Sequence, residues 1–172
     1  MSTKKNKVYL LSGLAGLFVA MNAYILSGVG GMAKNTLLEL AQAVVKEHGL
    51  NADPKMIAAM IQIESSGNPT AVRYEAHIRD VSVGLMQTLG GTARWLAEDM
   101  GYNAHGVPSN EDLMKPEVSI YFGAAYIEWL STYKGQNRGV KWIVESYNGG
   151  PNNSNSQTLN HWNKYKAARM KV

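Results

Sequence analysis

DPKMIAAMIQIESSGNP, residues 53–69, is the stretch that decides the fold of this chain. Asp53 fits the N-cap of a helix, and Pro54 fits its first helical position. The apolar run that follows has the composition of a buried helix, and it leads directly to Glu64. Residues 67–69, Gly-Asn-Pro, then force a turn. The stretch therefore predicts a buried helix that ends at a single carboxylate.

The chain beyond residue 34 shows further helical signals and no clear period-2 strand pattern. A capping-box pattern at Thr36–Glu39 opens one helix, and Gly49 closes it. The predicted helices cover residues 36–48, 54–64, 92–100, 116–133, 140–147 and 159–170. With 172 residues, 45% of them apolar, the chain has the material for one compact domain. The expected fold class is all-α.

Composition excludes several kinds of site. The chain has no cysteine, which removes disulfides, thiolate nucleophiles and cysteine-ligated metals. Its formal charge of +4 suits a polyanion, a membrane surface or an anionic cell wall, but its basic residues are scattered and no nucleic-acid-binding motif is present. No two histidines have the i,i+4 spacing of a zinc site. We therefore expect no metal, no cofactor and no nucleic acid partner.

The start of the chain has the pattern of a membrane segment. Several lysines precede an uncharged stretch, Val8–Ala33, that is apolar as far as Leu26. A helix needs about 20 mostly apolar residues to cross a bilayer. We expect residues 1–33 to form a membrane anchor, with residues 34–172 as a domain on the extracytoplasmic side. A cleaved signal peptide, which makes the domain a secreted protein, and a buried core helix remain as alternatives.

Glu64 is the candidate catalytic residue. It follows a strongly apolar helix and lies in its last turn, where the negative end of the helix dipole opposes a second negative charge. Apolar neighbours also withhold solvation from a carboxylate. Both effects favour the protonated carboxyl that a general acid needs in order to hand a proton to a glycosidic oxygen. An ordinary exposed glutamate at a helix end is the alternative explanation for this residue alone.

Three short motifs follow one another along the chain. IESSGNP occupies residues 63–69, GLMQ occupies 84–87 with GTA at 91–93, and SYNGG occupies 146–150. In this order, and separated by predicted helices, the motifs resemble those of the lytic transglycosylase family, which cleaves peptidoglycan. The soluble-lytic-transglycosylase (SLT) catalytic domain of that family has a helical, goose-type lysozyme-like fold with an active-site cleft. The resemblance implies the same fold here.

The resemblance also implies an activity and a set of site residues. Glu64 would protonate the oxygen between N-acetylmuramic acid and N-acetylglucosamine, then deprotonate the muramoyl 6-hydroxyl so that a 1,6-anhydro ring closes. The positions that match the family's substrate-binding residues are Ser65, Gly84, Met86, Gln87, Tyr147 and Asn148. Some of these residue types also fit a helix cap, a core aromatic ring or a turn. The implied partner is peptidoglycan or a related N-acetylated glycan, and the implied state is a monomer.

The sequence departs from the family pattern at several positions. Ser146 replaces an alanine, and Lys115 stands where an aspartate or asparagine is usual before proline. His161 stands where the family has a tyrosine, and the sequence leaves it open whether this histidine contacts sugar or lies at the surface. Residues 73–82 and 121–131 resemble the plant and algal branch of the family, which leaves peptidoglycan and chitin-like polymers both possible as substrates.

Two other functions stay open at the level of sequence. Glu75 and Asp80 are candidate second carboxylates, and a lysozyme- or chitinase-like hydrolase of the inverting type needs a second carboxylate roughly 6.5–9.5 Å from the first. A membrane-tethered module that binds glycan without cleaving it is the non-enzymatic alternative. Glu64 argues against that module, because a pure binder gains little from a poorly solvated acid.

Overall fold

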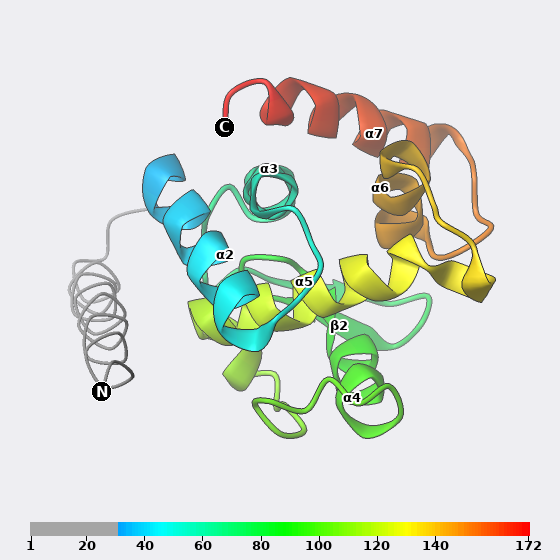
Figure 1. Ribbon diagram of the computed structural model, residues 1–172. Coiled ribbons are helices and arrows are strands. Elements are labelled where there is room, and N and C mark those ends of the chain that lie inside the picture. The colour runs from blue at the N-terminus through cyan, green and yellow to red at the C-terminus, as the bar shows by residue number, and fades with distance from the viewer. Residues whose placement is uncertain (1–30) are drawn as a thin grey trace, which may run out of the picture. The chain divides into compact units, whose positions relative to one another are not determined.

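The computed structural model describes residues 31–172, which form one unit (Figure 1). Within this range, no helix combines the length and the apolar character that a bilayer crossing requires. The segment expected to be an anchor or signal, Val8–Leu26, lies outside the described residues. The anchor therefore stays a prediction from sequence.

The described residues are predominantly helical, as expected from the sequence. Their α-helices are α2 (Lys34–His48), α3 (Pro54–Glu64), α4 (Gly90–Glu98), α5 (Pro116–Ser131), α6 (Val140–Gly149) and α7 (Ser156–Arg169). Single turns of 3-10 helix, η1 (Asp112–Met114) and η2 (Tyr133–Gly135), flank α5. Each predicted helix is present, with ends that differ from the predicted ones by at most three residues.

Local signals set the ends of α2 and α3. The Asp53 carboxylate accepts a hydrogen bond from the Lys55 amide at 2.9 Å, with Pro54 in the first turn, so the predicted N-cap of α3 is confirmed. Gly49 ends α2 in the left-handed conformation, at φ 64°, also as predicted. The capping box at Thr36–Glu39 was a wrong prediction, because α2 begins earlier, after Ala33, and has no side-chain cap.

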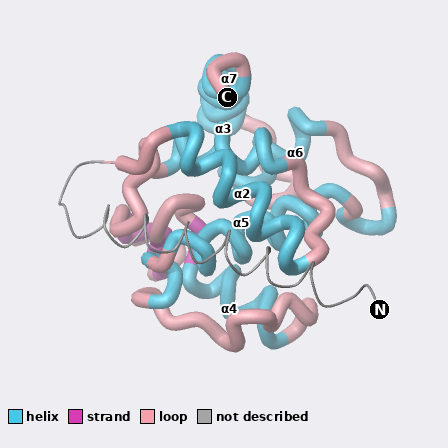
Figure 2. Tube along the Cα trace, turned by 60° about the vertical axis from the view of Figure 1, so that its left-hand side comes forward, coloured by secondary structure: helices cyan, strands magenta, loops and turns pink. Residues whose placement is uncertain are grey.

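Helix α5 passes through the middle of the fold and packs against α2, α3, α4 and α6 (Figures 1 and 2). Nearly its whole length is buried, because apolar and small residues alternate on all of its faces. Gly123 brings the helix against Met86, since a Cβ at this glycine would lie 2.6 Å from Met86 Cγ. The Ser119 hydroxyl accepts a hydrogen bond from the Met86 amide at 3.1 Å. The central helix therefore supports the second sequence motif directly.

The structure contains a small sheet that the sequence analysis did not predict. Strands β1 (Val72–Glu75), β2 (Asp80–Val83) and β3 (Thr88–Leu89) form an antiparallel sheet in the order β1-β2-β3. Val72 pairs with Val83, and Ser82 pairs with Leu89. Strands this short are difficult to recognise from alternation, and three of the four β1 residues are exposed. The fold remains mainly helical, with this sheet beside the second motif.

Helix α7 packs against α3 and α6, as Figure 1 shows. Its first turn is held by a capping box in which the Asn155 side chain accepts from the Thr158 amide at 3.0 Å and the Thr158 hydroxyl accepts from the Asn155 amide at 3.0 Å. Near its other end, Arg169 forms an ion pair of 2.9 Å with Asp53, at the start of α3. Helix α7 is thereby fixed to α3 along its length.

Candidate active site

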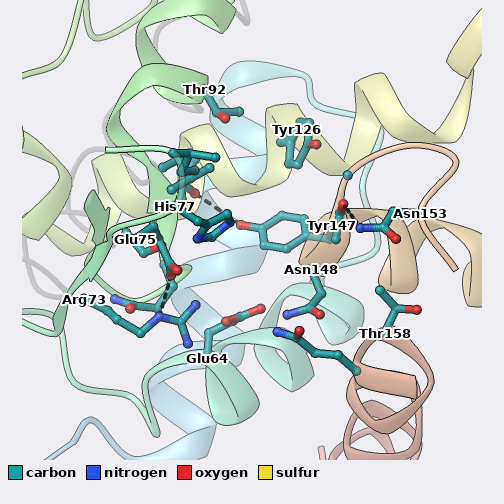
Figure 3. Close-up of a pocket in the computed structure, with 18 of the residues that line it drawn as sticks. Glu64, Arg73, Glu75, His77, Thr92, Tyr126, Tyr147, Asn148, Asn153 and Thr158 are labelled. Carbon is teal, nitrogen blue, oxygen red and sulfur yellow. Dashed lines mark hydrogen bonds and ion pairs between the residues drawn. The ribbon is translucent and has the colours of Figure 1, made fainter. Parts of the chain in front are cut away.

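A pocket of about 320 Å³ opens where α3, the sheet, α6 and α7 meet (Figure 3). Glu64 lines the pocket from the end of α3, and residues of the β1–β2 hairpin line another part of it. Tyr147 and Asn148 reach it from the end of α6, and Thr158 reaches it from the start of α7. The pocket therefore collects residues from the first and third motifs, together with Gln87 of the second.

Glu64 lies at the last position of α3, as predicted, and its side chain is only 9% exposed. Its Oε1 atom lies 3.2 Å from Nε2 of His161, on α7. Of the two possibilities that the sequence left open for His161, the surface position is excluded, because this residue is 8% exposed and contacts the candidate acid. Figure 3 shows the Glu64 carboxyl and the Asn148 amide pointing into the same pocket.

Ser65 joins the first motif to the second. Its hydroxyl donates to the Leu85 carbonyl at 2.8 Å and accepts a hydrogen bond from the Gly67 amide at 3.2 Å. It also lies 3.3 Å from the Ile61 carbonyl, one turn back in α3. Ser65 is not among the residues that line the pocket. Its bonds favour a role in holding the end of α3, and hence Glu64, over contact with sugar.

The second motif supports the pocket mainly from behind. Gly84 has φ 77°, and a Cβ there would overlap the Leu113 carbonyl and come within 2.7 Å of Ser119 Oγ, so its close approach is to protein. The Met86 side chain is fully buried. Gln87 lines the pocket, and its amide nitrogen donates to the Ala71 and Gly84 carbonyls at 3.0 Å. Of the second-motif residues named as candidates, only Gln87 reaches the pocket wall.

Tyr147 links the third motif to the second. Its hydroxyl donates to the Met86 carbonyl at 2.9 Å and lies 3.2 Å from the Thr88 hydroxyl. Burial raises the pKa of the Tyr147 phenol well above 10.0, and the negative charge of Glu64 adds to the increase. The phenol therefore stays a neutral hydrogen-bonding group beside Glu64 at any physiological pH.

Asn148 lines the pocket and carries a hydrogen-bond acceptor that has no partner within the described residues. Its Oδ1 atom is buried and has no hydrogen-bond partner within residues 31–172. A buried polar atom of this kind costs free energy unless a ligand or water satisfies it. Gly149, next in the chain, allows α7 to approach, because a Cβ there would lie 2.6 Å from Thr158 Cγ2. The arrangement suits a ligand that carries an N–H donor.

The candidate second carboxylates have different positions. Glu75 lines the pocket, where its Oε1 atom forms an ion pair of 2.6 Å with Arg73 and accepts from the Ser82 hydroxyl at 3.2 Å (Figure 3). Asp80 does not line the pocket, and its oxygens accept from the Val81 and Gly91 amides at 2.7 and 2.9 Å. Asp80 thus holds the start of α4. Of Glu75 and Asp80, only Glu75 remains a candidate for the second carboxylate of the pocket.

Several pocket residues were missed by the sequence analysis. Thr88 carries no motif signal, Tyr126 lies in the stretch 121–131 that was noted only for its family resemblance, and the histidines, His77 among them, were weighed only as zinc ligands. Thr158 was placed outside the predicted helix, although it belongs to the first turn of α7. The charged loop of residues 73–82 was the available signal for His77 and Arg73, since such a loop beside a motif is a frequent place for site residues.

Comparisons with known proteins agree with the three motifs. A family model described as the transglycosylase SLT domain matches residues 43–169. Among similar solved structures is the 70 kDa soluble lytic transglycosylase from Escherichia coli, with TM-score 0.53 and 22% identity over 74% of this chain and 19% of that chain. A complex of the 70 kDa soluble lytic transglycosylase with bulgecin A gives TM-score 0.53 and 21% identity over 77% of this chain and 20% of that chain. The chain thus spans about a fifth of the length of the structures it matches. The structural likeness confirms the expected fold class.

Proposed function

The chain belongs to the family of transglycosylase SLT domains, and on this premise we propose that it is a lytic transglycosylase that acts on peptidoglycan. The observation that carries the proposal is the position of Glu64. Its side chain is 9% exposed and lines a pocket together with Tyr147 and Asn148 of the third motif. A poorly solvated carboxyl at the wall of a pocket that can hold a sugar is the arrangement that general acid catalysis at a glycosidic bond uses.

In the proposed reaction, Glu64 acts twice. As an acid it protonates the oxygen of the β-1,4 bond between N-acetylmuramic acid and N-acetylglucosamine, and the C1–O bond breaks with its electron pair on the leaving oxygen. As a base, the resulting carboxylate removes the proton of the muramoyl 6-hydroxyl, whose oxygen then bonds to C1. The product carries a 1,6-anhydro ring, and Glu64 recovers its proton. No second carboxylate is needed, because the substrate supplies the nucleophile.

We assign the N-acetyl group of the sugar to Asn148. The unpartnered Oδ1 atom can accept a hydrogen bond from the acetamido N–H, which removes the cost of a buried acceptor without a partner. Ser65, Gly84 and Met86 support the site from behind in this proposal, while Gln87, Tyr147 and Asn148 face the substrate pocket. Each assignment agrees with the burial and hydrogen bonds of its residue.

Hydrolysis is the second candidate function, because Glu75 lies in the same pocket. Its carboxylate is paired with Arg73 and bonded to Ser82, which favours a fixed charge over a base that activates water. Product analysis separates the two reactions. Digestion of purified peptidoglycan sacculi should release fragments that end in 1,6-anhydromuramic acid, detected by mass spectrometry. Products with reducing ends only would replace the transglycosylase assignment with a lysozyme-like hydrolase, and no cleavage at all would favour a glycan-binding module.

We propose an extracytoplasmic location for the domain, since its substrate lies beyond the cytoplasmic membrane. The lysines before Val8 and the apolar stretch to Leu26 support an anchor that leaves residues from about 34 onward outside. Membrane fractionation combined with protease treatment of spheroplasts tests this. A membrane-bound, protease-accessible domain supports the anchor, a trimmed soluble product indicates a cleaved signal peptide, and a protease-shielded domain contradicts the location.

A further inference from the structure

The contact between His161 and Glu64 is the feature of the pocket that the proposed mechanism leaves unused. Nε2 of His161 lies 3.2 Å from Oε1 of Glu64, and each side chain is 9% exposed. The two atoms are within hydrogen-bond distance, but their orientation is not that of a hydrogen bond, and Nε2 is buried with no hydrogen-bond partner within residues 31–172. A buried ring nitrogen is costly without a partner, and the Glu64 carboxyl is the polar group against it.

Side-chain contacts on both sides of His161 fix the helix that carries it. The capping box of Asn155 and Thr158 fixes the first turn of α7, one turn before the histidine. The ion pair between Arg169 and Asp53 fixes α7 to the start of α3, while His161 meets Glu64 at the end of α3. Helices α3 and α7 therefore share two polar side-chain contacts. One is buried in the pocket, and the other lies 33% and 50% exposed, outside it.

We propose that His161 is a positioning residue for Glu64, whose Nε2–H donates to Oε1 and so keeps the catalytic proton on Oε2. This proposal rests on the proposed function, in which Glu64 serves as acid and then as base. Oε2–H gives its proton to the glycosidic oxygen, and the carboxylate that remains keeps the Nε2–H donor on Oε1. Oε2 then takes the proton of the 6-hydroxyl. His161 keeps its own proton throughout, so no proton is gained or lost by the imidazole.

The physical basis is that the two ring nitrogens of a histidine are distinct, and the hydrogen bonds around the ring decide which one carries hydrogen. A donor that faces a carboxylate stabilises the charge formed after proton transfer, and a bond to a charged group is stronger than a neutral one. A positioned donor also limits rotation of the acid, which preserves its alignment with the bond to be cut. The effect should therefore appear in kcat and leave KM nearly unchanged.

The first test compares side chains at position 161 by kcat and KM on purified glycan strands. His161→Gln keeps an N–H near the position of Nε2, whereas His161→Asn places its amide too far back and His161→Leu has no donor. We expect kcat to fall about 10-fold to 100-fold in the Asn and Leu variants, the cost of a hydrogen bond to a charged group. KM should change less than about 3-fold, because the proposed donor contacts Glu64 and not the substrate. The Gln variant should retain most of the activity.

Arg169→Gln is the matched control, because it removes the ion pair with Asp53 that also joins α3 and α7, and Arg169 does not line the pocket. It should keep the kcat of the unaltered chain. Equal losses in Arg169→Gln and His161→Asn would reduce His161 to a helix-packing residue and overturn the proposal. Equal losses of kcat in His161→Gln and His161→Asn would overturn the proposal as well. Circular dichroism and thermal unfolding identify a variant that fails to fold. If His161→Leu fails to fold, the comparison of His161→Gln with His161→Asn still tests the proposal.

A second measurement does not require activity. Long-range 1H–15N correlation spectra of the labelled full chain report which ring nitrogen of His161 carries hydrogen. We expect hydrogen on Nε2, and we expect the Nε2 resonance to move in Glu64→Gln. A neutral ring with hydrogen only on Nδ1, or an Nε2 resonance unaffected by Glu64→Gln, overturns the proposal. Absence of glycan cleavage in the unaltered chain would contradict the proposed function instead, so the two failures are distinguishable.

Discussion

The hydroxyl of Ser65 donates a hydrogen bond of 2.8 Å to the carbonyl of Leu85, 20 positions further along the chain. This bond connects the end of α3 to the buried second motif, and it is reinforced by the bond that the same hydroxyl accepts from Gly67. The position of Glu64 therefore depends on a neighbour that does not itself reach the pocket. Catalytic alignment and stability of the fold should be linked at this residue.

Ser65→Ala should lower both stability and activity. Removing the hydroxyl leaves the part-buried Leu85 carbonyl and Gly67 amide without this partner, which costs about 1–3 kcal/mol of unfolding free energy. Chemical denaturation measures the loss, and kcat on sacculi should fall with KM nearly unchanged. Ser154→Ala, a change at an exposed loop serine, is the control and should behave like the unaltered chain. Unaltered stability in Ser65→Ala would show that the bond is replaced by water.

Glu64→Gln should abolish glycan cleavage and preserve the fold. The amide keeps the shape of the side chain and loses the transferable proton, so the rate should fall by about 100-fold to 10,000-fold, the usual contribution of general acid–base catalysis. Binding to insoluble peptidoglycan should remain, as measured by co-sedimentation. Glu75→Gln is the informative comparison, because it changes the other carboxylate of the pocket. If Glu75→Gln were the inactive variant and Glu64→Gln active, the catalytic assignment would be reversed.

Gly84→Ala should be much more destabilising than Gly101→Ala. Both glycines have positive φ, 77° and 82°, so both alanines pay a similar backbone cost of roughly 1–2 kcal/mol. Only at Gly84 does the new methyl group overlap the Leu113 carbonyl, whereas a Cβ at Gly101 meets nothing within 4 Å. We expect Gly84→Ala to unfold at a markedly lower temperature or to be insoluble. Similar melting temperatures for the two variants would contradict the packing role assigned to Gly84.

The free energy of unfolding should decrease between pH 10 and about 12. Burial raises the pKa of Tyr126 from 10.0 to about 12, with the nearby Tyr133 adding to the increase. The phenol ionises at a lower pH in the unfolded chain than in the folded chain. Its contribution to the free energy of unfolding is therefore fully present below pH 10.0 and is lost as the pH rises through the pKa of the folded state. Tyr126→Phe should therefore make the decrease shallower, as measured by denaturation at several pH values. Tyr74→Phe, at a side chain 63% exposed, should leave the slope unchanged, and an equal effect of both variants would count against burial as the cause.

The helix that carries Glu64 could be predicted because its signals are local. Asp53, Pro54 and the apolar run lie within a few residues of one another, and each acts through short-range geometry. Strands of two and four residues could not be predicted, since they are too short for a reliable alternation of apolar and polar positions. The sheet packs against α4 and α5, which follow it in the chain, so no short stretch of sequence contains all of its contacts.

The composition of the site was predictable only in part. Glu64, Gln87, Tyr147 and Asn148 line the pocket, and their motifs marked all four. Gly84 was predicted from its motif to bind substrate, whereas the Leu113 carbonyl, which no local pattern places there, makes its close approach one to protein. His161 reaches Glu64 through the packing of α7 on α3, a long-range contact that no local pattern encodes. Its replacement of the family tyrosine was the one visible signal.

The ion pair between Asp53 and Arg169 joins positions 116 residues apart, and helix α7 can form it only after nearly the whole domain has left the ribosome. Until then the nascent chain has α3 and its acid, but lacks the imidazole and the α7 wall of the pocket. The pocket can therefore be complete only after the residues of α7 have been synthesised. Loss of residues 155–169 would likewise remove the α7 wall of the pocket, although these residues lie far along the chain from Glu64.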